Sequence, residues 1–94
     1  MIYGYARRTI DAEAGLMEMK EVSFQVEPDF LREIARFFLE MADRREKGTF
    51  KTDHIHIGEI IEGWDSRHPQ KDIIVVLPQD EFEEYLANLP RVGF

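Results

Sequence analysis

The longest regular hydrophobic pattern in the chain lies in the segment PDFLREIARFFLEMADRREKG, from Pro28 to Gly48. Apolar residues recur there at steps of three and four, which places them on one face of an α-helix. The centre of this stripe is formed by Leu31, Ile34, Phe38 and Met41, and it is widened by Phe30, Ala35, Phe37 and Ala42. Pro28 suits a first helical turn and Gly48 suits the position after a helix end. We therefore predict a helix over residues 29–47.

Two strands are predicted before this helix. Residues 1–8 alternate in side-chain character, residues 11–15 are small and polar as in a turn, and residues 16–26 form the second strand. The apolar positions of the second strand change from odd to even numbers on passing Lys20, as shown by Met17, Met19, Val22 and Phe24. We expect a β-bulge near Lys20, because one extra residue restores the alternation.

Two further strands are predicted after the helix. Residues 51–57 form the third, in which histidines alternate with isoleucines in the order His54, Ile55, His56 and Ile57. The isoleucines are expected to face the helix, which leaves both histidines on the far face of the sheet. The run IIVVL in residues 72–77 does not alternate, so we expect both faces of that strand to be covered, by a central place in the sheet or by a partner. Residues 58–71 are expected to form a long loop.

A short C-terminal helix is predicted over residues 80–89, with an apolar stripe of Phe82, Tyr85, Leu86 and Leu89. The element order is then β-β-α-β-β-α. This order is typical of an α+β domain, and we predict a mainly antiparallel four-stranded sheet with one long helix packed across it. A chain of 94 residues is expected to form a single domain over residues 1–94.

Composition narrows the range of partners. The formal net charge is -7, from 12 basic and 19 acidic residues, which disfavours nucleic acid and anionic lipid because both need a positive surface. The surplus of carboxylates either keeps a small protein in solution or suits a basic partner. Cysteine is absent, and we expect no export signal and no membrane span, so a cytoplasmic protein is predicted.

The sequence contains no pattern that predicts catalysis or a cofactor. The two serines, Ser23 and Ser66, are not in a glycine-flanked nucleophile turn, and no glycine-rich phosphate loop is found. We therefore expect a protein that is not an enzyme, with no catalytic residues.

The His54-Ile55-His56 pattern is the one feature that suits a metal ion. Alternate residues of a strand project to the same side, where two imidazoles can share a divalent ion. A third ligand would have to come from Asp53, Glu59 or His68, and two ligands alone do not make a site. We expect no metal in this chain and interpret the histidines as surface or partner-contact residues.

Trp64 is the only tryptophan of the chain and lies in the predicted loop. It is either a structural plug that folds over the edge of the sheet or an anchor for a binding partner. The carboxylates of Glu59, Glu62 and Asp65 lie nearby in the sequence and suit a basic protein surface. The predicted partner-binding residues are His54, His56, Glu59, Glu62, Trp64 and Asp65.

Several of these stretches together resemble the immunity protein 32 family of bacterial polymorphic toxin systems. They are the YGY strand, KEVSF, LREIARFFLEMAD, DHIHI, the lone Trp64 and DIIVVLP, which span most of residues 2–78. The resemblance implies a small cytoplasmic α+β protein that neutralises a cognate toxin domain by occlusion, without catalysis. The positions that match the polar pattern of the family are His54, His56 and Trp64. An alternative that stays open is a small homodimeric structural or regulatory module.

Overall fold

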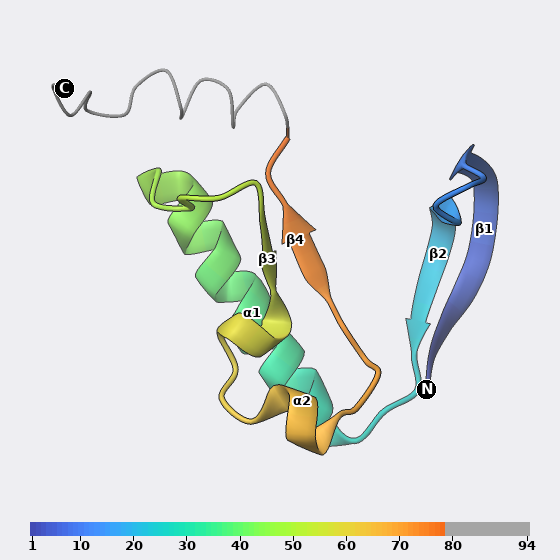
Figure 1. Ribbon diagram of the computed structural model, residues 1–94. Helices are drawn as coiled ribbons and strands as arrows, with labels where there is room; N and C mark the ends of the chain where they lie inside the picture. Colours follow the sequence, from blue (N-terminus) through green and yellow to red (C-terminus); the bar gives the residue numbers. More distant parts are fainter. Residues whose placement is uncertain (79–94) are drawn as a thin grey trace, which may run out of the picture. The chain divides into compact units, whose positions relative to one another are not determined.

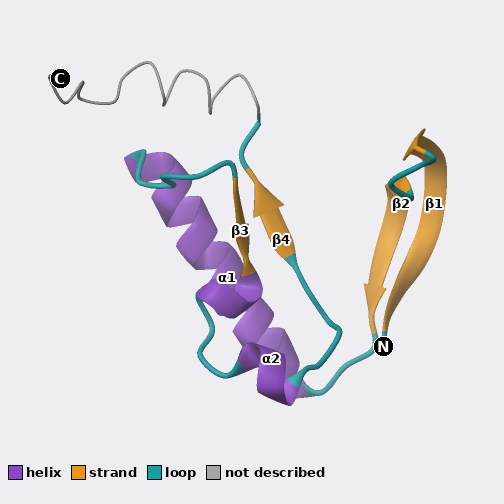
Figure 2. Cartoon of the chain, viewed as in Figure 1, coloured by secondary structure: helices purple, strands orange, loops and turns teal. Residues whose placement is uncertain are grey.

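The computed structural model of the chain describes residues 1–78, and Figure 1 shows the order of their elements. These are β1 (Ile2–Asp11), β2 (Leu16–Phe24), α1 (Pro28–Lys47), β3 (His54–His56), the 3₁₀ helix η1 (Ile57–Glu59), α2 (Trp64–Arg67) and β4 (Ile74–Val76). The described part is an α+β structure with antiparallel strand pairs (Figure 2). The helix predicted over residues 80–89 lies outside the described residues. In the part that is described, no helix combines the length and the apolar character needed to cross a membrane.

The prediction of one four-stranded sheet is wrong for the described residues. The strands form two separate two-stranded sheets, β1 with β2 and β3 with β4. Each strand pairs with its antiparallel neighbour along the chain, and β3 is only three residues long because the backbone turns into η1 at Ile57. Side-chain alternation predicts where a strand lies and which face it buries, but it does not determine which strands pair.

The chain divides into two compact units, one of Met1–Leu31 and one from Arg32 onward. The first unit contains the β1–β2 hairpin. Tyr5 pairs with Glu21 and Ala6 pairs with Met19, so Lys20 is the extra residue of a bulge, which confirms the predicted irregularity. The prediction of a single domain over residues 1–94 stays a prediction.

Helix α1 agrees with the predicted range of 29–47 to within one residue. It starts at Pro28 and ends at Lys47, and Gly48 follows with a positive φ of 69°. The Thr49 N–H donates to the carbonyl of Arg44 at 2.8 Å and the Gly48 N–H to that of Arg45 at 3.3 Å. This pair of bonds is a Schellman motif, which satisfies two carbonyls that the helix leaves unpaired.

The face of α1 that is buried differs from the predicted one. Phe37 is 0% exposed and Phe38 is 45% exposed, so the prediction of Phe38 and Leu31 as the centre of the stripe is wrong. The buried residues of the helix are Phe30, Ile34, Phe37 and Met41. At about 100° per residue they fall within an arc of about 60°, and Leu31 and Phe38 lie to one side of it. The helix is apolar over a wider arc than its core uses.

The core of the second unit is formed by side chains from several of its elements. The buried apolar residues between Arg32 and Pro78 are Ile34, Phe37, Met41, Phe50, Ile55, Ile57, Ile61, Trp64 and Leu77. The β3–β4 ladder continues beyond both strands, because Ile57 donates to the carbonyl of Ile73 and Leu77 to that of Asp53, each at 2.8 Å. These bonds fix the two ends of the small sheet to the segments that fill the core.

One face of β4 is open. Ile74 is 45% exposed and Val76 is 64% exposed, whereas Leu77 is buried. Within residues 1–78, the prediction that both faces of this strand are covered is therefore wrong. The alternative that a partner covers the second face stays a prediction.

The adjacent residues Phe37 and Phe38 provide a matched test of the burial of α1. We expect Phe37→Ala to lower the free energy of unfolding by about 3–5 kcal/mol, because it leaves a cavity in the core. Phe38→Ala is expected to change it by about 1 kcal/mol or less, because half of that ring is already in water. Urea denaturation followed by circular dichroism measures both. Equal losses for the two variants would contradict the assigned face.

Candidate functional site

The outer face of the β3–β4 sheet brings together two histidines and two apolar residues. His54 pairs with Val76 and His56 with Ile74, and directly paired residues project to the same side of a sheet. Ile55 is 4% exposed and Ile57 is 0% exposed, so the predicted split between buried isoleucines and outward histidines is confirmed. We call the surface formed by His54, His56, Ile74 and Val76 the histidine face.

Each histidine of this face is held by a carboxylate. The Nδ1 atom of His54 lies 2.7 Å from Oδ1 of Asp53, and the Nδ1 atom of His56 lies 2.6 Å from Oδ2 of Asp72. The two ring centroids are 5.1 Å apart with an angle of 76° between the planes. In the neutral form of the ring, a carboxylate beside Nδ1 favours the tautomer that has its proton on Nδ1. The Nε2 atom is then an acceptor.

Two further carboxylates lie at the end of β3. Oε2 of Glu59 accepts a hydrogen bond from the backbone N–H of His56 at 2.6 Å. The carboxylate of Asp65 lies against Gly58, where a Cβ atom would come within 2.9 Å of Oδ2. Glycine at position 58 therefore leaves room for this carboxylate. The result is a rim of negative charge around the histidine face, formed by Asp53, Glu59, Asp65 and Asp72.

The hydrogen bonds and charges at this site shift the pKa values of His56 and Asp53. The hydrogen bond with Asp72 raises the pKa of His56. Burial opposes this effect, and the charges of Asp72, Glu59 and Asp65 add to it. The hydrogen bond with His54 lowers the pKa of Asp53. The raised pKa favours the charged form of His56, and the lowered pKa favours the carboxylate form of Asp53.

Trp64 does not lie on this surface. Its side chain is 1% exposed, and the indole N–H donates to the carbonyl of Lys71 at 2.7 Å. The ring of His68 packs on it with a centroid distance of 4.3 Å. The interpretation of Trp64 as a surface anchor for a partner does not fit this burial, whereas the alternative of a structural plug does.

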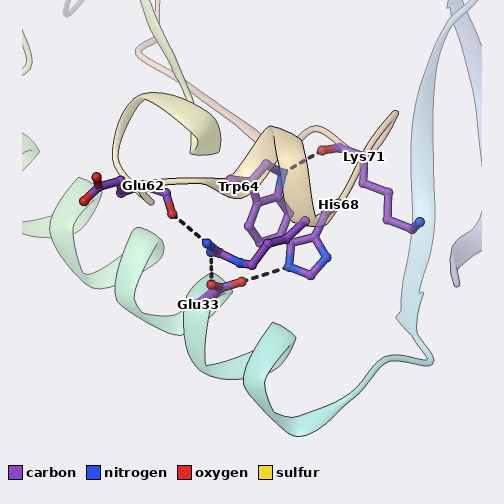
Figure 3. A network of polar contacts seen from close by, with 6 residues as sticks. Glu33, Glu62, Trp64, His68 and Lys71 are labelled. Atoms are coloured by element: carbon purple, nitrogen blue, oxygen red, sulfur yellow. Dashed lines mark hydrogen bonds and ion pairs between the residues drawn. The ribbon is translucent and has the colours of Figure 1, made fainter.

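Around Trp64, the loop is joined to α1 by a polar network centred on Glu33 (Figure 3). Oε2 of Glu33 lies 3.0 Å from Nε2 of His68, and Oε1 accepts from the guanidinium of Arg67. The same guanidinium donates to the backbone carbonyl of Glu62 at 2.8 Å. Glu33 has 13% of its side chain exposed, so this is a largely shielded link between segments more than 30 positions apart.

The network could not be found by sequence reasoning. Glu33 lies on the helix about 70° from the centre of the buried stripe, so its position at the border of the core could be predicted from the helical period. Its partners could not, because Arg67 and His68 follow it by 34 and 35 positions. Glu62 and Asp65 were predicted for partner contact, and both are exposed in the structure.

Within the described residues, the histidine pair is not completed to a metal site. Among residues 1–78, no group of three or more histidine and acidic side chains is placed to hold a metal ion. Of the third ligands considered from the sequence, His68 bonds Glu33, Asp53 bonds His54 and Glu59 bonds the backbone of His56. Each of these groups is already engaged in another contact.

The pKa of His56 is the first test of this geometry. We expect NMR titration of the ring protons to give a pKa above the usual histidine value, and Asp72→Asn to lower it toward that value. Stabilisation by the pair is full below the pKa of the unfolded chain and is lost as the pH rises through the raised pKa. Asp53→Asn is the control and should leave the pKa of His56 raised. An unshifted His56 in the native chain would contradict the contact with Asp72.

The shielded link of Glu33 can be compared with an exposed pair on the same helix. We expect Glu33→Gln to lower the free energy of unfolding by about 1.5–3 kcal/mol, because two charge-assisted bonds are weakened. Glu40→Gln should cost about 0.5 kcal/mol or less, since Glu40 bonds Arg44 one turn away with 43% of its side chain in water. Urea denaturation measures both, and equal costs would argue against the network.

Comparison of the chain with models of protein families, with curated proteins and with solved structures gives no match.

Proposed function

We propose that this chain is an immunity-type protein of a bacterial toxin system. It binds a basic toxin domain with its histidine face and neutralises it by occlusion, in the cytoplasm and without catalysis of its own. One observation carries the proposal. Ile74 and Val76 are exposed beside two histidines, and carboxylates surround them, which matches the apolar centre and charged rim of a protein-binding surface.

Charge supports a basic partner. The net charge of -7 and the carboxylates of Asp53, Glu59, Asp65 and Asp72 around one face favour an approaching cationic surface. Opposite charges on two partners steer diffusional encounter and raise the association rate. A toxin whose active site binds a polyanion presents such a surface, and a carboxylate-rimmed face can cover it.

Trp64 contributes to this proposed surface indirectly. Its buried ring is bonded to the carbonyl of Lys71, and the next residue, Asp65, belongs to the same short helix α2. Gly63, which precedes α2, has a φ of 74°, a left-handed conformation that glycine adopts without strain. The Trp64 plug and the Glu33 network thus position the backbone that carries Glu62 and Asp65.

The hydroxyl groups of Ser23 and Ser66 lie in regular secondary structure. Ser23 lies in β2 opposite Tyr3, and Ser66 lies in the four-residue helix α2. The histidines of the site bond carboxylates, in the arrangement of charged pairs.

A second candidate is a homodimeric module, and the apolar side chains exposed on the β1–β2 hairpin favour it. Those at least 39% exposed are Tyr3, Tyr5, Ile10, Leu16, Met17, Met19, Val22 and Phe24. Val22 and Phe24 lie on one face of the hairpin and Tyr3 and Tyr5 on the other, and exposed apolar surface on a small protein commonly marks an interface. This candidate uses the hairpin, whereas the immunity-type function uses the histidine face.

The test is binding to the toxin domain encoded by the gene next to that of this chain. We expect a stable one-to-one complex in calorimetry and restored growth when both are co-expressed. Val76→Lys should weaken binding at least tenfold, because it places a cation in the centre of the face. Leu39→Lys is the matched control, since Leu39 is 68% exposed and Val76 is 64% exposed. Equal effects of both variants, or a neighbouring gene without a toxin domain, would overturn the proposal.

A further inference from the structure

We infer that His54 and His56 form half of a zinc site, which is completed when the histidine faces of two copies of this chain meet around one ion. The ion is then bound by four imidazole nitrogens, two from each copy. This inference does not rest on the proposed function, because it concerns a metal ion and a second copy of the same chain.

The spacing of the two rings matches that of imidazoles sharing a tetrahedral ion. A zinc–nitrogen distance of about 2.0–2.1 Å places each ring centroid about 3.2 Å from the ion. Two such rings at a tetrahedral angle have centroids roughly 5 Å apart. The observed separation between the centroids of His54 and His56 is 5.1 Å. The separation of the two rings is therefore compatible with both binding one ion.

The Nδ1 atoms of both rings contact carboxylates, as is common for histidines that bind a metal ion through the other ring nitrogen. Asp53 and Asp72 lie 2.7 and 2.6 Å from the Nδ1 atoms of His54 and His56. In metal sites such carboxylates fix the ring orientation and raise the basicity of the other nitrogen. Both of these contacts are made by Nδ1 and not by Nε2. Two equivalent carboxylate–histidine pairs on one face are thus available for a ligand at Nε2.

The number of ligands favours a second copy of the chain as the source of the remaining two. One chain supplies two imidazoles, and no third metal-binding side chain completes the site among residues 1–78. Structural zinc sites are four-coordinate, and a two-fold axis through the ion doubles two ligands to four. The exposed Ile74 and Val76 are covered in the same contact.

The charge of the rim makes this dimer dependent on the metal. Two histidine faces bring together two sets of the carboxylates of Asp53, Glu59, Asp65 and Asp72. Like charges at such a contact repel each other, which disfavours the metal-free dimer. A divalent cation at the centre offsets part of this repulsion, and the same negative field attracts the cation to the face.

The experiment uses the purified full-length chain titrated with zinc chloride. We expect calorimetry to give half a zinc ion per chain, and light scattering after size-exclusion chromatography to show a doubling of mass that EDTA reverses. Cobalt(II) should give the intense visible absorption of a tetrahedral site. Asp72→Asn should weaken the binding of zinc by about 10- to 100-fold without removing it, because the carboxylate positions the ligand.

His54→Ala and His56→Ala should each abolish zinc-dependent dimerisation. His68→Gln is the matched control, because it removes the only other histidine of the chain, and it should leave dimerisation unchanged. Circular dichroism confirms that each variant is folded. Zinc bound one-to-one by a monomer, absence of binding, or a dimer that persists in EDTA would overturn the inference. None of these outcomes depends on a toxin domain, so they are distinct from failure of the proposed function.

Discussion

The burial of Ile55 and Ile57 determines the orientation of the segment from which the candidate site is built. Both side chains belong to the core of the second unit, with 4% and 0% of their surface exposed. Because side chains alternate along a strand, this burial turns His54 and His56 to the other side of the β3–β4 sheet. The burial of the two isoleucines therefore determines on which side of the sheet the imidazoles of His54 and His56 lie.

Local patterns of the sequence predicted much of the fold. The ends of α1, the bulge at Lys20 and the orientation of β3 follow from rules that act over a few residues, and each is confirmed. The buried face of α1 was misjudged because the helix carries apolar residues over a wide arc. Periodicity alone could not distinguish Phe37 from its neighbour Phe38. Strand pairing failed for a related reason, since it is a property of tertiary contacts.

The candidate site was predictable in part for the same reasons. The histidines were found because their spacing of two residues has a direct geometric meaning on a strand. The role of Asp72 was not predicted, because Asp72 lies 16 positions after His56 and no local sequence pattern links the two residues. The role of Trp64 depended on whether the loop folds back over the core. The carbonyl of Lys71 and the ring of His68 supply that answer, and both are contacts of the folded chain.

The two proposed uses of the histidine face are mutually exclusive at any moment. A zinc-bridged dimer covers Ile74 and Val76, which are the apolar centre that a toxin domain would contact. Anything that binds only the free monomer shifts the equilibrium away from the dimer by mass action. The tighter the complex with a toxin, the lower the fraction of chain left to share a metal ion. If both proposals hold, zinc with a second copy and a basic partner therefore compete for the same face.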